Sequence, residues 1–131
     1  MAQEDKELLL KDLYTRLPYG VKFKSEYDEN LQEIHYIKDE EIYTRTHPHL
    51  PYWIETIKPY LRPLSSMTDE EREEYRKFSY YGAAGVRPYT HGDFVAVPSF
   101  EKMDWLNAHH FDYRGLIEKG LALEAPEDMY V

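Results

Sequence analysis

The sequence contains no cysteine, which excludes disulfide bonds and zinc sites built from thiolates. It also has no run of apolar residues long enough to span a bilayer. The first seven residues are polar and of mixed charge, unlike the basic and then apolar start of a signal peptide. We therefore expect a cytoplasmic protein that is not attached to a membrane.

Clusters of basic residues are also missing. The chain has 16 lysines and arginines against 25 aspartates and glutamates, for a net charge of −9. Proteins that bind nucleic acid usually present a basic face to the phosphates, so direct nucleic-acid binding is disfavoured. The acidity favours solubility, and it also suits a chain that binds a basic surface of a partner.

Motifs that bind phosphates or activate a serine are absent from the chain. No Walker loop, dinucleotide fingerprint or nucleophile elbow is present. The segment Gly82–Gly85 reads GAAG, but it lacks the preceding strand and the following helix that such a motif needs. We expect no cofactor.

Tyrosine, in contrast, is abundant, with 13 residues in 131. Tyrosine is a good strand residue, and it is also enriched at protein interfaces because it combines a large apolar ring with a polar tip. Bulky aromatic residues in predicted loops are the candidates for contact with a partner protein. These candidates are Tyr52 and Trp53, beside the loop THPHLP, and Tyr80, Tyr81 and Tyr89 in a glycine-rich loop.

The first half of the chain predicts one helix followed by strands. Leu9, Leu13 and Leu17 recur every four residues and predict a helix from Gln3 to Arg16, which Pro18 and Gly20 end. Alternating apolar and polar residues then predict short antiparallel strands, in a meander or an SH3-like barrel. The predicted strands cover residues 21–27, 31–38, 41–45 and 51–56. Residues 57–64 contain two prolines and predict a turn-rich linker.

The second half of the chain predicts mainly helices. Thr68 and Glu71 form a capping-box pattern at the start of a helix over residues 69–78. A short strand over 93–97, a helix over 100–109, a helix over 113–119 and a strand over 121–125 follow. Together these elements predict an α+β fold in a single domain, 1–131. An N-terminal helix and a β-rich half (1–64) would pack against a helical half (65–131).

Three longer motifs resemble a widespread family of short proteins encoded by gut Bacteroidetes and by their phages and prophages. The motifs are RLPYG at residues 16–20, IKPYLRPLSSMT at 57–68 and WLNAHHFDYRGLIEKGLALEAPE at 105–127. The resemblance covers roughly half of the chain and brings no catalytic residue with it. It implies a bacterial cytoplasm, a mobile-element background and a small accessory or host-interaction protein.

The most conspicuous motif holds His109, His110 and Asp112. Adjacent residues of a helix point about 100° apart, so two neighbouring histidines rarely bind the same metal ion. We expect a structural corner instead, in which a histidine ends one helix beside Trp105 and Asp112 caps the next. Gly120 would then end that second helix in the left-handed conformation.

Two further functions stay open beside a non-catalytic interaction module. The first is a metal-dependent hydrolase that uses His47, His49, His91 and Asp93, provided that the fold brings these loop residues together. The second is an acidic inhibitor that mimics nucleic acid and binds a basic host protein.

Overall fold

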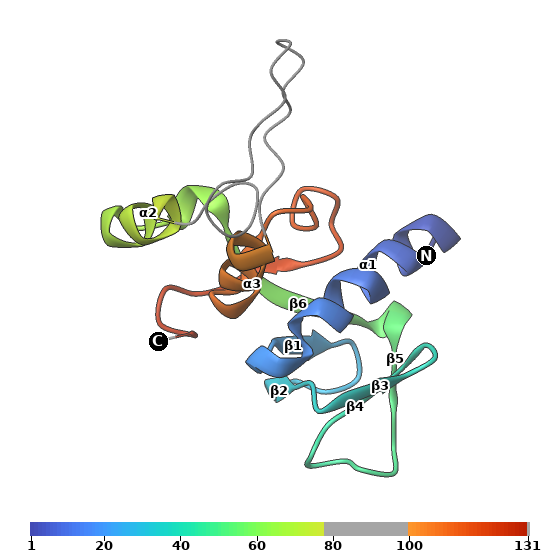
Figure 1. The fold of residues 1–131 in the computed structure, drawn as a ribbon. Coiled ribbons are helices and arrows are strands. Elements are labelled where there is room, and N and C mark those ends of the chain that lie inside the picture. The colour runs from blue at the N-terminus through green and yellow to red at the C-terminus, as the bar shows by residue number, and fades with distance from the viewer. Residues whose placement is uncertain (78–99, 131) are drawn as a thin grey trace.

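A computed structural model describes residues 1–77 and 100–130 of the chain (Figure 1). It confirms the α+β fold class, with an N-terminal helix, sheets of short strands and further helices. The helices are α1 (Gln3–Arg16), α2 (Asp69–Arg76) and α3 (Phe100–Ala108), with single 3-10 turns at Leu17–Tyr19, Ile54–Thr56 and Leu64–Ser66. The strands are β1 (Lys22–Ser25), β2 (Gln32–Glu33), β3 (Tyr36–Lys38), β4 (Glu41–Tyr43), β5 (Tyr52–Trp53), β6 (Ile57–Pro63), β7 (Phe111–Asp112) and β8 (Leu123–Glu124).

Helix α1 has the bounds predicted from its leucine spacing. Leu9 and Leu13 are fully buried, and their face of the helix also buries Asp12 and Arg16. Pro18 lies in the 3-10 turn that follows, and Gly20 adopts a left-handed conformation with φ of 69°. The chain can therefore reverse into β1 directly after the helix.

The strands form two sheets. In one, β3, β4 and β5 pair antiparallel in chain order, which matches the later part of the predicted meander, whereas β1 and β2 belong to the other sheet. In the other, β6 pairs antiparallel with β1 and parallel with β7 and β8. The predicted strand over residues 31–38 is two short strands, β2 and β3, which belong to different sheets.

The prediction of a linker at residues 57–64 was wrong, because this segment is β6, the longest strand described. Pro59 pairs in register with Phe23 and Pro63 pairs with Asp112. Prolines four residues apart turn their missing N–H groups toward the same edge of a strand, so the other edge keeps its hydrogen bonds. Two prolines in this spacing are thus compatible with a strand in the middle of a sheet.

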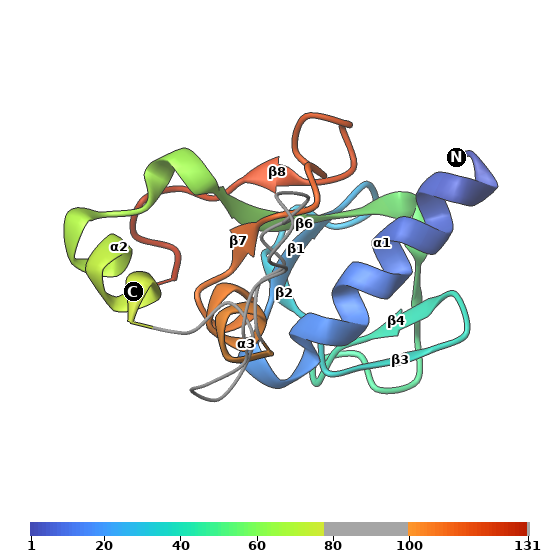
Figure 2. The same cartoon turned by 45° about the horizontal axis from the view of Figure 1, so that its top comes forward.

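Helix α1 crosses the strands and closes the main core (Figure 2). This core contains Leu9 and Leu13 from the helix, Phe23, Ile42 and Leu61 from the strands, and further buried residues near the C-terminus. A second cluster forms where Trp105, Leu106 and Phe111 meet. No helix among the described residues is long and apolar enough to cross a membrane.

The corner after α3 confirms part of its prediction. Both Asp112 carboxylate oxygens accept backbone N–H bonds, from Leu116 and Ile117, at 2.9 Å each. Gly120 is left-handed, with φ of 77°, and the N–H of Leu121 bonds the carbonyl of Leu116 at 2.9 Å. The predicted helix over 113–119 was wrong, because Gly115 is also left-handed and leaves room for only one turn.

Candidate interaction surface

Three large apolar side chains lie exposed around one cavity. Tyr27 is 79% exposed, Leu50 is 69% exposed and Trp53 is 50% exposed. The cavity has a volume of about 280 Å³, and its wall includes Tyr27, Asp28, His47, Leu50, Pro51, Tyr52, Trp53 and Thr56. We call the five residues Tyr27, Leu50, Pro51, Tyr52 and Trp53 the aromatic patch.

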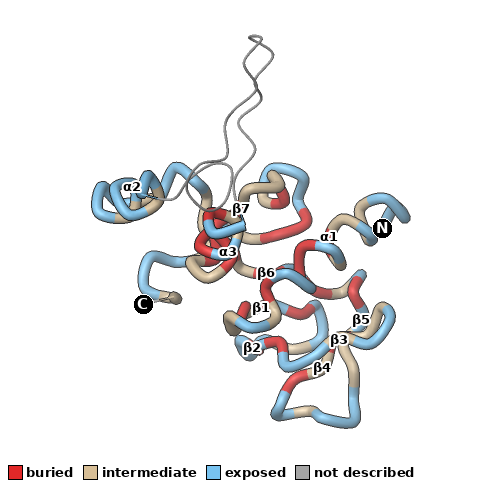
Figure 3. Tube along the Cα trace, in the orientation of Figure 1, coloured by how far each residue is buried: buried red, intermediate tan, exposed pale blue. Residues whose placement is uncertain are grey.

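The patch combines the chain just after β1 with the loop between β4 and β5, at the bottom of Figure 1. Figure 3 shows that most of this loop is exposed. Tyr27 follows the end of β1, where its N–H donates a hydrogen bond to Ser25 Oγ at 3.1 Å. The next turn is held by Asp28, whose Oδ1 accepts the N–H of Asn30 at 2.9 Å.

Side-chain hydroxyls hold the loop between β4 and β5 in place. Thr44 is buried, and its Oγ1 accepts the N–H of His47 at 3.2 Å. The Thr46 hydroxyl donates to Gln32 Oε1 at 3.0 Å and lies 3.2 Å from His47 Nδ1. These bonds tie the first part of the loop to β2.

Tyr52 forms a wall of the cavity. Its ring meets Phe23 of the core edge-on, with centroids 5.2 Å apart, and its hydroxyl donates to Asp28 Oδ2 at 2.9 Å. Burial and the bond to Asp28 raise the pKa of Tyr52 to about 12, so the phenol stays protonated at neutral pH. Trp53, the next residue, also lines the cavity and is 50% exposed.

The structure brings two of the predicted contact residues, Tyr52 and Trp53, to this patch. Sequence reasoning missed Tyr27, which ended a predicted strand, and Leu50, although a leucine between Pro48 and Pro51 was a usable signal. Tyr80, Tyr81 and Tyr89 lie outside the described residues, so their role stays a prediction.

Only two of the four predicted metal ligands lie among the described residues. The described residues contain no group of three or more histidines and carboxylates placed to hold a metal ion. His47 lies at the aromatic cavity and His49 is exposed in the same loop, while His91 and Asp93 lie outside the described residues. A site that joins all four residues therefore remains a prediction.

The two histidines of the corner after α3 each stack on another aromatic ring. His109 stacks on Trp105, with ring centroids 4.0 Å apart, and its Nδ1 lies 2.9 Å from the Trp105 carbonyl oxygen. His110 is left-handed, with φ of 63°, and stacks on Tyr130 at 3.6 Å. Burial, and next the nearby charge of Arg16, lower the pKa of His110 to about 4, so this imidazole is neutral at pH 7.

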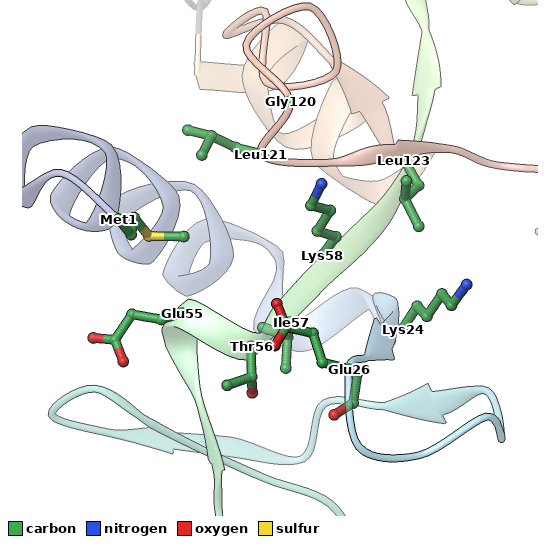
Figure 4. Close-up of a pocket in the computed structure, with 11 residues that line it drawn as sticks. Met1, Lys24, Glu26, Glu55, Thr56, Ile57, Lys58, Gly120, Leu121 and Leu123 are labelled. Atoms are coloured by element: carbon green, nitrogen blue, oxygen red, sulfur yellow. The ribbon is translucent and has the colours of Figure 1, made fainter.

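Two other cavities differ from the aromatic one in their charge. The cavity in Figure 4, of about 280 Å³, lies between the start of β6 and the segment Gly120–Leu123, and Lys58 points toward that segment. Its wall mixes charges of both signs. A groove between α2 and α3 carries basic side chains over leucine and methionine, namely Arg72, Arg76, Lys102 and Arg114.

No family model, curated protein or solved structure matches this chain. The candidate surface therefore rests on the geometry described above.

Proposed function

We propose that this chain is a non-catalytic interaction module that binds another protein through the aromatic patch. The observation that carries the proposal is the exposure of Tyr27, Leu50 and Trp53 around one cavity. Exposed apolar patches on small soluble domains mark interaction sites, and tryptophan and tyrosine dominate the binding energy of many interfaces.

The hydrogen bonds beneath the patch support this proposal. Thr44, Thr46 and Gln32 hold the start of the loop before Leu50, β5 pairs with β4 and carries Trp53, and Asp28 joins the turn after Tyr27 to the Tyr52 hydroxyl. A surface that is already ordered loses less conformational entropy when a partner binds. The patch can therefore contribute affinity without first folding onto its partner.

The titratable groups with shifted pKa values at the patch are unsuited to acid–base catalysis at neutral pH. Hydrogen bonds from the Asn30 N–H and then the Tyr52 hydroxyl lower the pKa of Asp28, and the pKa of Tyr52 is about 12. General acids and bases work best when their pKa lies near the working pH. An ionised carboxylate and a protonated phenol instead suit recognition.

The proposal extends to the setting that the family resemblance implies. We place the module in the cytoplasm of a bacterium, in a phage or mobile-element background, where its partner would be a protein of the host. The net charge of −9 suits a partner with a basic contact surface.

A capture experiment from a lysate of such a bacterium tests the proposal. Replacing Tyr27, Leu50 and Trp53 together by alanine should reduce partner capture by about tenfold or more, because aromatic anchors are often worth about 2 kcal/mol each. The matched control is Tyr14→Ala, which removes a 48% exposed tyrosine of α1 that does not line the cavity. Equal capture by the triple variant and the unchanged chain would reject the patch as the binding surface.

The same assay tests the other predicted contact residues. Replacement of Tyr80, Tyr81 and Tyr89 by alanine should lower capture if the glycine-rich loop also contacts the partner. The hydrolase alternative is tested separately by titration with zinc or manganese, which should raise the melting temperature only if a metal site exists.

A further inference from the structure

The wall of the aromatic cavity combines aromatic rings with one negative charge. Tyr27, Tyr52 and Trp53 belong to the wall, and Asp28 is the only carboxylate among its described residues. No lysine or arginine belongs to that described wall. Aromatic faces carry negative electrostatic potential, so rings and carboxylate attract the same kind of guest.

The Asp28 carboxylate is ionised, and no described residue forms an ion pair with it. It accepts hydrogen bonds from the Asn30 N–H at 2.9 Å, from Gln32 Nε2 at 3.1 Å and from the Tyr52 hydroxyl at 2.9 Å. All three donors are neutral. Among the described residues, no lysine or arginine nitrogen forms an ion pair with Asp28.

The neighbouring carboxylate is already neutralised. Glu55, close to the Thr56 end of the cavity, pairs with Lys6 of α1 at 2.7 Å. The uncompensated negative charge at the cavity is therefore that of Asp28, and it lies beside the ring of Tyr52.

We propose that the aromatic cavity binds a cationic side chain of the partner protein, with arginine preferred to lysine. This inference rests on the proposed interaction function and identifies the chemistry of the group that the patch recognises. A cation placed over the rings gains cation–π attraction as well as the charge of Asp28. A neutral side chain of the same size gains only the apolar contact.

The hydrogen bonds to Asp28 explain the preference for arginine. Three donors already occupy most of the positions at which its two oxygens accept bonds, so contact with the ring faces must supply much of the recognition. Guanidinium is planar, stacks on aromatic rings and is more weakly hydrated than ammonium. Arginine therefore loses less hydration and gains more contact when it enters the cavity.

The two other cavities described above do not fit the same guest. The groove between α2 and α3 has basic side chains and no carboxylate among its described lining residues, and the cavity in Figure 4 contains Lys24 and Lys58. Only the aromatic cavity, among the three, combines several rings with an unpaired carboxylate.

Nuclear magnetic resonance of the full chain tests this inference directly. The probe is a capped five-residue peptide with arginine between glycines, compared with peptides that hold lysine or the neutral analogue citrulline. All titrations are run at pH 8 in the same buffer, so that only the peptide or the variant changes. The indole N–H signal of Trp53 reports binding. The buried Trp105, whose Nε1 bonds Glu74 at 2.9 Å, reports an intact fold.

We expect saturable shifts of the Trp53 signal, with the arginine peptide binding at least fivefold more tightly than the citrulline peptide and more tightly than the lysine peptide. Asp28→Asn should weaken binding of the arginine peptide at least fivefold. Glu29→Gln is the matched control, because it removes one negative charge from an exposed neighbour that does not line the cavity. Tyr27→Leu, at a 79% exposed position, removes a ring face without touching the core and should weaken binding about threefold.

Equal affinity for arginine and citrulline, no binding of any peptide, or full affinity of the Asp28→Asn variant would overturn the cation site. The capture assay separates this failure from failure of the proposed function. If capture depends on the patch but the arginine peptide does not bind, the interaction module stands without a cation site. If the peptide binds but the triple alanine variant captures the partner as well as the unchanged chain does, the cation site stands and the proposed function fails.

Discussion

At the scale of single residues, the buried His110 predicts a dependence of stability on pH. His110 is 7% exposed, its Nδ1 has no hydrogen-bond partner among the described residues, and its backbone is left-handed. A non-glycine residue in this conformation is uncommon and costs free energy that the surroundings must offset. Here the ring of Tyr130 stacks on the imidazole, and the His110 carbonyl accepts the Arg62 N–H at 2.7 Å.

The lowered pKa of His110 predicts a loss of stability in mild acid. The unfolded chain binds a proton near pH 6.5, whereas burial in the folded chain lowers the pKa to about 4. The unfolded state therefore holds more protons between these values, and stability falls as the pH falls. From pH 7 to pH 5, the free energy of unfolding should drop by about 2 kcal/mol more for the wild type than for His110→Asn.

Urea denaturation at both pH values measures this difference. Asparagine tolerates the left-handed conformation, so the substitution removes the titrating group without a new backbone cost. His49→Asn, at an exposed position, is the control and should behave like the wild type. An equal drop in the free energy of unfolding for His110→Asn and the wild type between pH 7 and pH 5 would show that His110 is not buried as described.

At the scale of elements, a buried ion pair within α1 also bonds to the C-terminal part of the chain. Asp12 and Arg16 are both fully buried, with Arg16 Nε 2.7 Å from Asp12 Oδ2. Arg16 Nη2 also donates to the carbonyl of Phe111 in β7 at 2.7 Å, and Arg114 Nε contacts Asp12 at 3.1 Å. The first helix is thus fixed to residues about a hundred positions later.

Asp12→Asn should lower the free energy of unfolding by about 3 kcal/mol, because it leaves two arginines without their carboxylate in a buried site. Chemical denaturation at pH 7 measures the effect. Glu4→Gln, in the exposed first turn of the same helix, should change stability by less than about 0.5 kcal/mol. A loss below about 1 kcal/mol for Asp12→Asn would contradict the role of this pair.

Elements governed by local rules could be predicted from the sequence. The leucine spacing located α1, and the pattern of Thr68 and Glu71 located the capping box of α2. The role of β6 could not be predicted. Its partners β7 and β8 are about fifty and sixty residues away, and its two prolines argued locally against a strand.

The candidate surface shows the same division. Tyr52 and Trp53 could be predicted because large aromatic residues beside a proline-rich loop are unusual. Tyr27 and Asp28 could not, since they reach the cavity through the pairing of β1 with β6 and through the hydroxyl of Tyr52. The local sequence pattern around each segment does not show that the two distant segments come together.

Charge is unevenly distributed over the whole molecule. Despite the net charge of −9, the groove between α2 and α3 has several basic side chains, and Asp28 is the one carboxylate among the described residues of the aromatic cavity. Binding through the patch should therefore depend weakly on salt. Raising sodium chloride from 0.1 M to 0.5 M should weaken partner binding by about threefold or less, because only a few exposed charges are screened.

Calorimetric titration with the captured partner measures this dependence. An inhibitor that mimics nucleic acid would pair many carboxylates with a basic surface, so its affinity would fall by about a hundredfold or more over the same range. A loss of that size would favour the acidic mimic over recognition by the patch.

The most direct test of the interaction module places a photoreactive benzoylphenylalanine at position 50 of the full chain in the lysate that is used for the capture experiment. Leu50 is 69% exposed at the rim of the cavity, and position 14 on α1 serves as the control. Irradiation should join the chain to one partner protein through position 50, and not through position 14. Absence of a crosslink at position 50, or the same products from both positions, would contradict binding through the aromatic patch.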